Sequence, residues 1–557
     1  MWAIKGSLLP LPGFPQVRAV LAGGRDHSFA SRRSLPTVEV QVGIDGRIRA
    51  VQARAHRSGV LVKDGSPTFQ LPSEAVIVPG LRDPHVHVRA AAAALASLDC
   101  AAAVDIPALL ARIEVRARQT PRGGWVRGWG YDEAMLAERR APSRVELERA
   151  GLGHPVVVHH RTGHAAVANG AALLRLGVAW RGTAGVDVDG VDRDENGEPT
   201  GLLVNAHRIL GRVPRLDSAT LTAGALQLGA QWTARGVTAI TDATATNGVD
   251  AISQLDAWAR QGILPQHVHA FISADRVDEA IHAGVPVLQM SPRCMSTTRR
   301  RVGDSARGPT TVAAACSLVG AKVSGAAEDI PELVRLARRY GWPVAIHAVE
   351  VDELEAALNV LSAVGPPLWG RDRIEHCGLV LPEQRSRLGR LPVAVVSNPS
   401  FLVYRGSKYA EELTDTEREW LYPVRSLLRA GVLVGAASDA PVTDSNPLEV
   451  ARAACTRVVA EGPASGQILG SGERVDARTA LALVTTLAGS LEGVDVRLTA
   501  GAQADFVVLS GLNEVRGQVG EDDTSLDSVR VLATVIGGRA HMLDACPDVD
   551  PNSARTA

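Results

Sequence analysis

Five short apolar runs in this chain each end on a histidine, an acidic residue or another polar residue. They end at His85-Val-His87, at His347, at His376, at Ser397-Asn398 and at Asp439. Helix-compatible sequence follows several of them, for instance residues 352–364 after His347. Short apolar segments that alternate with longer helical ones are typical of βα units built around a parallel sheet. Since such a sheet gathers the carboxyl ends of its strands on one side, the pattern predicts an α/β fold in which these polar residues meet.

The two ends of the chain differ from the middle. Residues 38–42 and 44–51 resemble two strands around an Asp45-Gly46 turn, and residues near the other end, 504–509 and 529–536, are rich in β-branched side chains. We therefore expect a distorted (β/α)8 TIM barrel over residues 79–490. Both chain ends, residues 1–78 and 491–545, would form a small β-sandwich domain. Residues from about 105 to 235 fit the βα rhythm poorly and predict an insertion that partly covers the barrel mouth.

Composition limits the classes of partner. Of the 557 residues 46% are hydrophobic, which is enough for a large core, and 59 Lys and Arg against 60 Asp and Glu leave a net charge of −1. This balance offers nothing that would attract nucleic acid or an anionic membrane surface. The six cysteines form no C-x-x-C pair, so neither a disulfide framework nor a zinc ribbon is indicated. We expect a soluble, cytoplasmic protein with a small-molecule substrate and no nucleic-acid or membrane partner; the sequence also allows a homo-oligomer.

The pair His85-x-His87 is the sharpest local motif. On a strand, residues i and i+2 point to the same side, so both imidazoles would face one point. Neutral imidazole is a common ligand for zinc and related divalent ions. In a chain with 15 histidines such a pair also arises by chance, and two packing histidines are the alternative interpretation.

A longer motif surrounds this pair. The segment Val78-Pro-Gly-Leu-Arg-Asp-Pro-His-Val-His87 resembles the P-G-x-x-D-x-H-x-H opening of the amidohydrolase superfamily. Later residues arrive in the order that this superfamily uses, namely Lys322, His347, His376 and Asp439. The chain is most similar to the YtcJ-like branch, also called amidohydrolase family 3, through residues 124–132, 161–169, 197–201 and 501–509. The resemblance runs from about residue 38 to 540.

The resemblance implies a divalent metal site, with zinc as the expected ion. Its ligands would be His85, His87, Lys322, His347, His376 and Asp439. Bound zinc lowers the pKa of a water molecule toward ~7, and Asp439 would accept the proton of the attacking water and return it to the leaving nitrogen. The site would hold one ion, or two if Lys322 is carboxylated and bridges them.

Two of these assignments have structural alternatives. Asp439 alone could be a turn or helix-capping aspartate ahead of Pro441. Lys322 could be an ordinary lysine at a strand end, because relatives commonly have Lys-x-x-x-Asp-Gly there and this chain has no matching aspartate. A buried lysine has a depressed pKa, which carbamate formation from a neutral amine requires.

Four residues are candidates for contacts with substrate. Arg161 and His164 lie in the insertion, and Tyr404 and Arg405 follow the apolar run that ends at Ser397. Arg405 would suit a carboxylate group. For Arg161 and His164, structural hydrogen bonding within the insertion is the alternative role.

The resemblance therefore favours a metal-dependent hydrolase of a non-peptide C–N bond, of the amide or N-formyl type. Deamination, or hydrolysis of a cyclic amide, is the alternative chemistry on the same metal site. A non-catalytic scaffold that kept the fold ranks last, because all five expected His and Asp positions are filled. The substrate stays open, since relatives often have His-x-x-Gly-Asp where this chain has His347-Ala-Val-Glu-Val.

Overall fold

A parallel sheet of eight strands forms the centre of the computed structural model, which describes residues 2–9, 11, 13, 37–53, 68–179, 189–285, 311–317, 329–368, 370–512 and 526–542. The strands follow one another in chain order: β6 (Leu81–Val86), β13 (Val237–Asp242), β14 (His267–Ser273), β15 (Thr311–Ser317), β16 (Val344–Ala348), β17 (Asp372–His376), β18 (Val393–Ser397) and β19 (Leu433–Ala436). A parallel bridge between Val86 and Ala440 joins the first strand to the segment after the last. The arrangement is a TIM-barrel-like α/β fold, and the predicted α/β class is confirmed.

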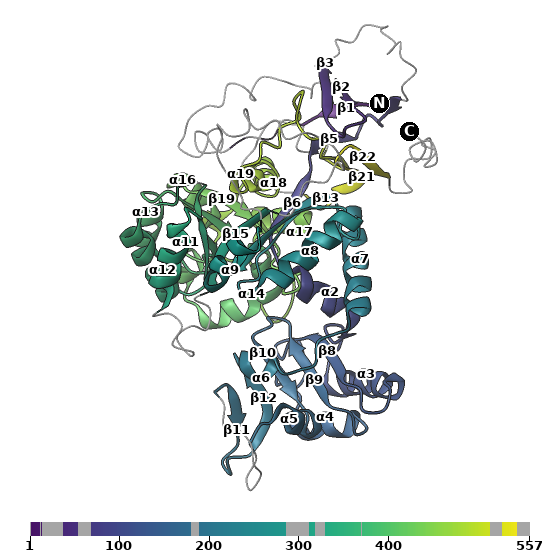
Figure 1. Ribbon diagram of the computed structural model, residues 1–557, viewed down its shortest axis with the longest axis vertical. Helices are drawn as coiled ribbons and strands as arrows, with labels where there is room; N and C mark the ends of the chain where they lie inside the picture. The colour runs from purple at the N-terminus through teal and green to yellow at the C-terminus, as the bar shows by residue number, and fades with distance from the viewer. Residues whose placement is uncertain are drawn as a thin grey trace.

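Helices alternate with these strands and pack on the outside of the sheet (Figure 1). They include α2 (Val88–Ala96), α7 (Ser218–Ala234), α8 (Val249–Gln261), α11 (Ile330–Arg339), α12 (Val351–Val364), α13 (Pro382–Leu388), α14 (Ser400–Glu412), α16 (Val424–Arg429), α17 (Pro447–Thr456), α18 (Ala477–Leu483) and α19 (Thr486–Leu491). Their buried faces and the strands share one large apolar core, to which Ile346, Ile374 and Val434 belong. No helix in the described ranges is long and apolar enough to cross a membrane.

Strands from both chain ends form a second sheet. Its order is β22-β21-β20-β5-β1-β2-β3, with β4 beside β1. The strands are β1 (Trp2–Leu8), β2 (Thr37–Val42), β3 (Ile48–Ala53), β4 (Thr68–Gln70), β5 (Val76–Pro79), β20 (Phe506–Ser510), β21 (Arg530–Ile536) and β22 (Arg539–Met542). Antiparallel pairing of β5 with β20 joins the two ends, and β2 and β3 flank the expected Asp45-Gly46 turn. Ile4, Ile77 and Phe506 lie in a separate core of this sheet.

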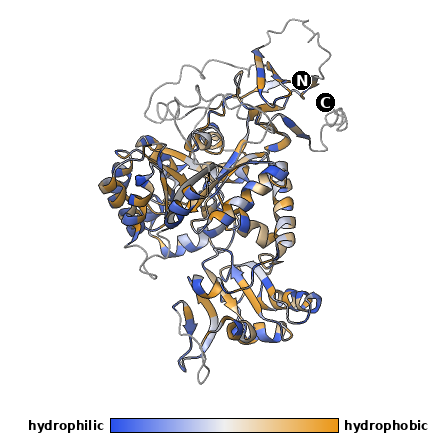
Figure 2. Ribbon diagram, viewed as in Figure 1, coloured by the Kyte–Doolittle hydropathy of each residue, from blue (hydrophilic) through white to orange (hydrophobic). Residues whose placement is uncertain are grey.

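A third sheet is inserted between α2 and α7, which pack against each other. Its strands are β7 (Leu98–Asp99), β8 (Val126–Tyr131), β9 (Val156–His160), β10 (Ala165–Ala168), β11 (Val191–Arg193) and β12 (Pro199–Val204), with helices α3 (Ile106–Gln119), α4 (Arg144–Ala150), α5 (Gly170–Leu176) and α6 (His207–Leu210). We call this unit, residues 98–210, the inserted module. Its central strands are largely hydrophobic in Figure 2. In Figure 1 it lies next to α2 and α14, the helices that directly follow β6 and β18 along the chain. It therefore approaches the carboxyl ends of the barrel strands.

Candidate active site

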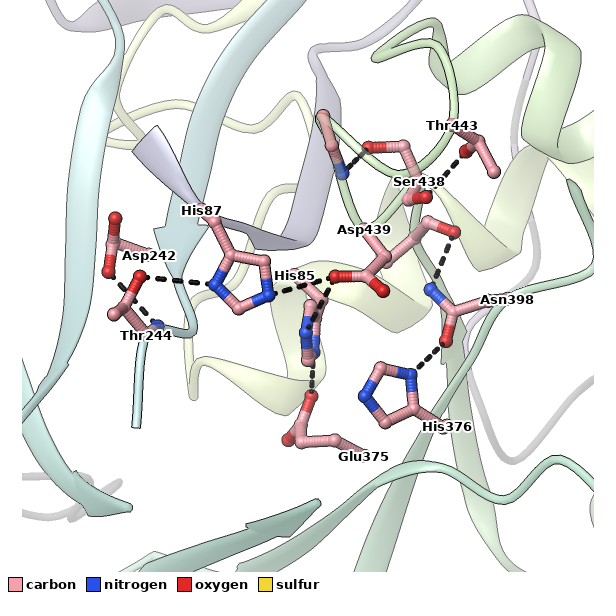
Figure 3. A network of polar contacts seen from close by, with 12 residues as sticks. His85, His87, Asp242, Thr244, Glu375, His376, Asn398, Ser438, Asp439 and Thr443 are labelled. Atoms are coloured by element: carbon pink, nitrogen blue, oxygen red, sulfur yellow. Dashed lines mark hydrogen bonds and ion pairs between the residues drawn. The ribbon is translucent and has the colours of Figure 1, made fainter. Parts of the chain in front are cut away.

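Four histidines and one aspartate converge at the carboxyl ends of the barrel strands. Figure 3 shows His85, His87, His376 and Asp439. β6 carries His85 and is followed by His87, whereas β16 and β17 carry His347 and His376. Asp439 follows β19. The ligand atoms of His85, His347 and His376 all lie within 4.8 Å of one another, as do those of His85, His87 and Asp439. His85 belongs to both groups and therefore lies at the centre of the site.

The inward-facing atoms of the site are buried and lack hydrogen-bond partners. This holds for Nε2 of His85, Nε2 of His347 and Oδ1 of Asp439. The Asp439 oxygen lies 3.3 Å from Nε2 of His85 and 3.0 Å from Nε2 of His87. An unsatisfied buried polar atom costs roughly 1–3 kcal/mol, so several of them around one point need a common partner. Nitrogen and carboxylate donors in this arrangement fit a divalent cation.

Three of the histidines are anchored through their outer ring nitrogen. Nδ1 of His85 lies 2.7 Å from Glu375 Oε2, Nδ1 of His87 lies 3.1 Å from Thr244 Oγ1, and Nδ1 of His376 lies 3.0 Å from Asn398 Oδ1. When Nδ1–H donates to such an oxygen, the Nε2 lone pair is left pointing into the site. The anchors are Glu375, Thr244 and Asn398. Sequence reasoning placed Asn398 at a strand end without a role and missed Glu375 and Thr244, although Glu375, a carboxylate directly before His376, was a usable signal.

Electrostatics leave two histidines neutral and the aspartate ionised. Burial, together with the positive charge of His85, lowers the pKa of His347 well below its usual value and that of His376 to about 4. Burial opposes a charged His85, but Asp439 and Glu375 on either side raise its pKa to about 9. Burial also opposes ionisation of Asp439, yet the contacts with His85 and His87 hold its pKa well below the ordinary value. Asp439 is therefore present as a carboxylate.

Asp83 holds the Asp439 loop against β6. Its Oδ1 accepts the backbone N–H of Ser438 at 3.1 Å and its Oδ2 accepts the Ser438 hydroxyl at 2.5 Å. The backbone N–H of Asp439 donates to the carbonyl of His85 at 3.0 Å. Asp439 (φ 61°) and His376 (φ 74°) both have left-handed backbone conformations, which non-glycine residues adopt at a cost. These hydrogen bonds thus hold the end of β6 against the segment after β19 and fix the position of the Asp439 side chain.

The remaining candidates lie around or beyond the site. Lys322 lies outside the described residues. Tyr404 and Arg405 on α14 line a pocket of about 290 Å³ together with residues of the inserted module. The guanidinium of Arg161 lies 5.2 Å from the centre of the Tyr404 ring. His164 is exposed, and its Nδ1 lies 3.2 Å from Asn205 Oδ1, apart from the residues that line this pocket.

Several known proteins resemble this chain over most of its length. The sequence profile of the amidohydrolase family matches residues 73–540. The chain is 26% identical to YtcJ of Bacillus subtilis (strain 168) over 494 residues, which cover 86% of this chain and 91% of YtcJ. It is 28% identical to the N-substituted formamide deformylase of Arthrobacter pascens over 548 residues, which cover 88% and 93% of the two chains.

A solved structure shares the fold. The metal-dependent hydrolase from Pyrococcus horikoshii OT3 matches with a TM-score of 0.66 at 19% identity, over 91% of this chain and 97% of that one. The family match covers most of this chain and includes every described histidine and aspartate of the site. The protein therefore belongs to the amidohydrolase family, and it is a hydrolase that acts on carbon–nitrogen bonds other than peptide bonds.

Proposed function

We propose that this protein is a metal-dependent amidohydrolase that cleaves an amide or N-formyl C–N bond of a small molecule. The observation that carries the proposal is the convergence of buried, unpartnered donor atoms from His85, His347 and Asp439. One relative over most of the chain is named an N-substituted formamide deformylase, which agrees with the N-formyl alternative.

Zinc is the ion we propose, because imidazole and carboxylate donors suit it. His85, His87, His347, His376 and Asp439 would hold it, and Lys322 would join them in a two-ion site. When bound, the ion would polarise the substrate carbonyl and lower the pKa of a water molecule.

Asp439 would perform the proton transfers. Its carboxylate is ionised and buried at the point where the histidines converge. It would take a proton from the attacking water and deliver it to the leaving nitrogen, so that the amine departs neutral. The hydrogen bond of its backbone N–H to the carbonyl of His85 would keep this carboxylate in place during both transfers.

We propose that the pocket between α14 and the inserted module takes the variable part of the substrate. Phe401 on α14 stacks on the ring of His376, with 6.4 Å between ring centres. Tyr404 lies about one helical turn further along α14, roughly 5 Å away, and lines the pocket. Tyr404, Arg405 and the neighbouring Arg161 would orient a polar group of the substrate. His164, which was also a candidate, does not line this pocket, and its contact with substrate stays a prediction.

The domain division and the compartment are further proposals. Residues 79–490 would form the catalytic (β/α)8 barrel, and the sheet joined by β5 and β20 would be the core of the β-sandwich domain of residues 1–78 and 491–545. A cytoplasmic location agrees with Cys100 and Cys377, which are buried free thiols.

The test combines elemental analysis of the purified protein with turnover on a substrate panel. The panel contains N-formyl amines, N-acyl amines, hydantoins and aminopurines. Bound metal with release of formate or of another carboxylate from the open-chain amides supports the proposal. Turnover restricted to hydantoins would make the enzyme a cyclic amidase, and ammonia released only from aminopurines would make it a deaminase.

The metal count has its own test at Lys322. If Lys322 is carboxylated, the wild type should bind two metals per chain, and Lys322→Ala should bind fewer and turn over poorly. Added acetate or propionate should then restore part of the activity by occupying the bridging position. Full activity of both proteins with a single metal would make the site mononuclear.

A further inference from the structure

The three anchored histidines differ in the charge of their anchor. The anchor of His85 is the carboxylate of Glu375, and both side chains are completely buried. The anchor of His87 is the hydroxyl of Thr244, and the side chain of His87 is 25% exposed. The anchor of His376 is the neutral side-chain amide of Asn398. Of these three anchors only Glu375 carries a charge.

Glu375 is itself fixed by Arg373. Both residues point to the same side of β17, two positions apart. Nε of Arg373 donates to Oε1 of Glu375 at 2.8 Å, and its Nη2 donates to Oε2 at 2.9 Å. This two-point contact fixes the plane of the carboxylate. The oxygen that receives Nη2 is also the one that lies 2.7 Å from Nδ1 of His85.

Arg373 also supports β6 directly. Its Nη2 donates to the carbonyl oxygen of Pro84, the residue before His85, at 2.8 Å. The guanidinium lies 4.9 Å from the centre of the Phe271 ring, which packs on it from β14. Arg373 thus holds both the backbone that carries His85 and the carboxylate that orients its ring.

We propose that the Arg373–Glu375 pair is a positioning unit for His85, and that it makes His85 the anchored histidine on which metal affinity depends most. Nδ1–H of His85 donates to the fixed carboxylate, so Nε2 is directed toward the site, 3.3 Å from Asp439 Oδ1. An anionic anchor also makes the ring a stronger donor than a hydroxyl or amide anchor does. The inference rests on the metal site of the proposed function, and it ranks the anchors of the three histidines by their effect on metal affinity.

The first test compares Glu375→Gln with Thr244→Val. Each substitution keeps the size of the side chain. Glu375→Gln removes the charge of one anchor, and Thr244→Val removes the hydroxyl of the other. Zinc affinity is measured by competition with a chelator, and ligand geometry by the visible absorption spectrum of the Co(II)-loaded protein. We expect a loss of about 10–100-fold for Glu375→Gln, with an altered Co(II) spectrum, and a smaller loss for Thr244→Val. Equal losses, or an unchanged affinity of Glu375→Gln, would overturn the proposal.

Glu375→Gln leaves the buried Arg373 without its ion partner, which by itself can destabilise the fold. The double variant Arg373→Met/Glu375→Gln removes both charges and keeps an oxygen that can accept Nδ1–H. Circular dichroism and thermal unfolding without metal report its folding. A folded double variant with a weakened zinc affinity supports the proposal, and one with wild-type affinity overturns it. If the wild type binds no metal, the proposed function fails as well, whereas an insensitive variant of a metal-binding wild type refutes only the positioning role.

Discussion

Two clusters of histidine and carboxylate occur in the described parts of this molecule, and they differ in how their histidines are held. In the barrel, Nδ1 of His85 lies 2.7 Å from Oε2 of Glu375, a hydrogen-bond acceptor, and its Nε2 faces the site. In the inserted module, Asp132, Glu133 and His160 bring their ligand atoms within 4.8 Å of one another. There the backbone N–H of Thr162 donates to Nδ1 of His160 at 3.2 Å.

The difference decides where the proton of each ring lies. In the neutral ring Nδ1 of His160 accepts this hydrogen bond, and in the charged ring Nδ1–H donates to Thr162 Oγ1 at 2.8 Å, so Nε2 carries a proton in both forms. This Nε2 faces Glu133 at 3.3 Å and Asp132 at 3.7 Å. Burial opposes a charged His160, but the two carboxylates raise its pKa above the ordinary value. Oδ2 of Asp132 also lies 3.5 Å from Nη1 of Arg161. The module cluster is therefore an ion pair of His160 with two carboxylates, whereas the barrel cluster brings three histidine ligand atoms within 4.8 Å of one another.

Removing one histidine from each cluster gives the largest expected contrast. His85→Ala should abolish both turnover and tight metal binding and leave the fold intact, because His85 belongs to both donor groups of the site. His160→Ala should leave the metal content unchanged. Elemental analysis, activity and circular dichroism of both variants check this.

Two results would break the contrast. A folded His85→Ala protein with normal activity would remove this histidine from the site, and loss of the whole fold would make the metal structural. A fall in metal content in His160→Ala would show that the module also binds a cation.

The next effect concerns the acid of the barrel cluster. Asp439→Asn keeps the size of the side chain and removes the charge that accepts a proton. The kcat should fall by about 10²–10⁴, the range for general acid–base groups, with a smaller change in metal content than in His85→Ala. Steady-state kinetics on metal-loaded protein checks this. A near-normal kcat would rule out proton transfer by Asp439.

Much of the barrel could be predicted from the sequence, whereas the inserted module was expected only as an insertion at about residues 105–235, without its strands. Five of the eight barrel strands were recognised because their apolar runs end on polar residues. β8 escaped because Gly128 and Gly130 resemble a turn. Both glycines have structural reasons: a Cβ on Gly128 would lie 2.6 Å from Sγ of Cys100, and Gly130 has a φ of 95°. The two glycines that the packing and backbone of β8 require thus gave this strand the composition of a loop.

The site, too, could be predicted only in part from the sequence. The histidines and Asp439 were predictable because they fall at strand ends in a familiar order. Their anchors were not, since Glu375 is 290 residues from His85 and Thr244 is 157 residues from His87. Such contacts arise from strand adjacency and side-chain direction across the barrel, which a single sequence does not encode locally.

The third prediction concerns Arg405 on α14, which lines the pocket between the barrel and the inserted module. Arg405→Met should lower kcat/KM by roughly 10–100-fold for substrates with a carboxylate, as expected for loss of a charge-assisted hydrogen bond. Uncharged substrates of the same size should be affected less. Arg405→Lys, which keeps the charge but not the two-point contact, should fall in between. Equal losses for both substrate types would assign Arg405 a structural role.

The smallest expected effect is the pH dependence of the module ion pair. Burial opposes ionisation of Asp132, but His160 and neighbouring donors lower its pKa to about 2, so its contribution is present above pH 3.8 and is lost as the pH falls toward 2. The raised pKa of His160 has the opposite sign: its contribution is complete below pH 6.5 and is lost at higher pH. The pair should therefore stabilise the fold most between about pH 4 and 6.5.

The lowering of the Asp132 pKa corresponds to roughly 2.5 kcal/mol at most, or about 2 °C in Tm for a chain of this size. We compare the thermal unfolding of His85→Ala with that of His85→Ala/His160→Gln, in chelator, from pH 3 to 8. The difference in Tm should peak inside the window, whereas the matched change at the exposed His164 should give no peak. Added zinc should not widen the difference, because Nε2 of His160 already holds a proton. If zinc stabilises only the protein that retains His160, the module cluster is a second metal site and the contrast between the two regions fails.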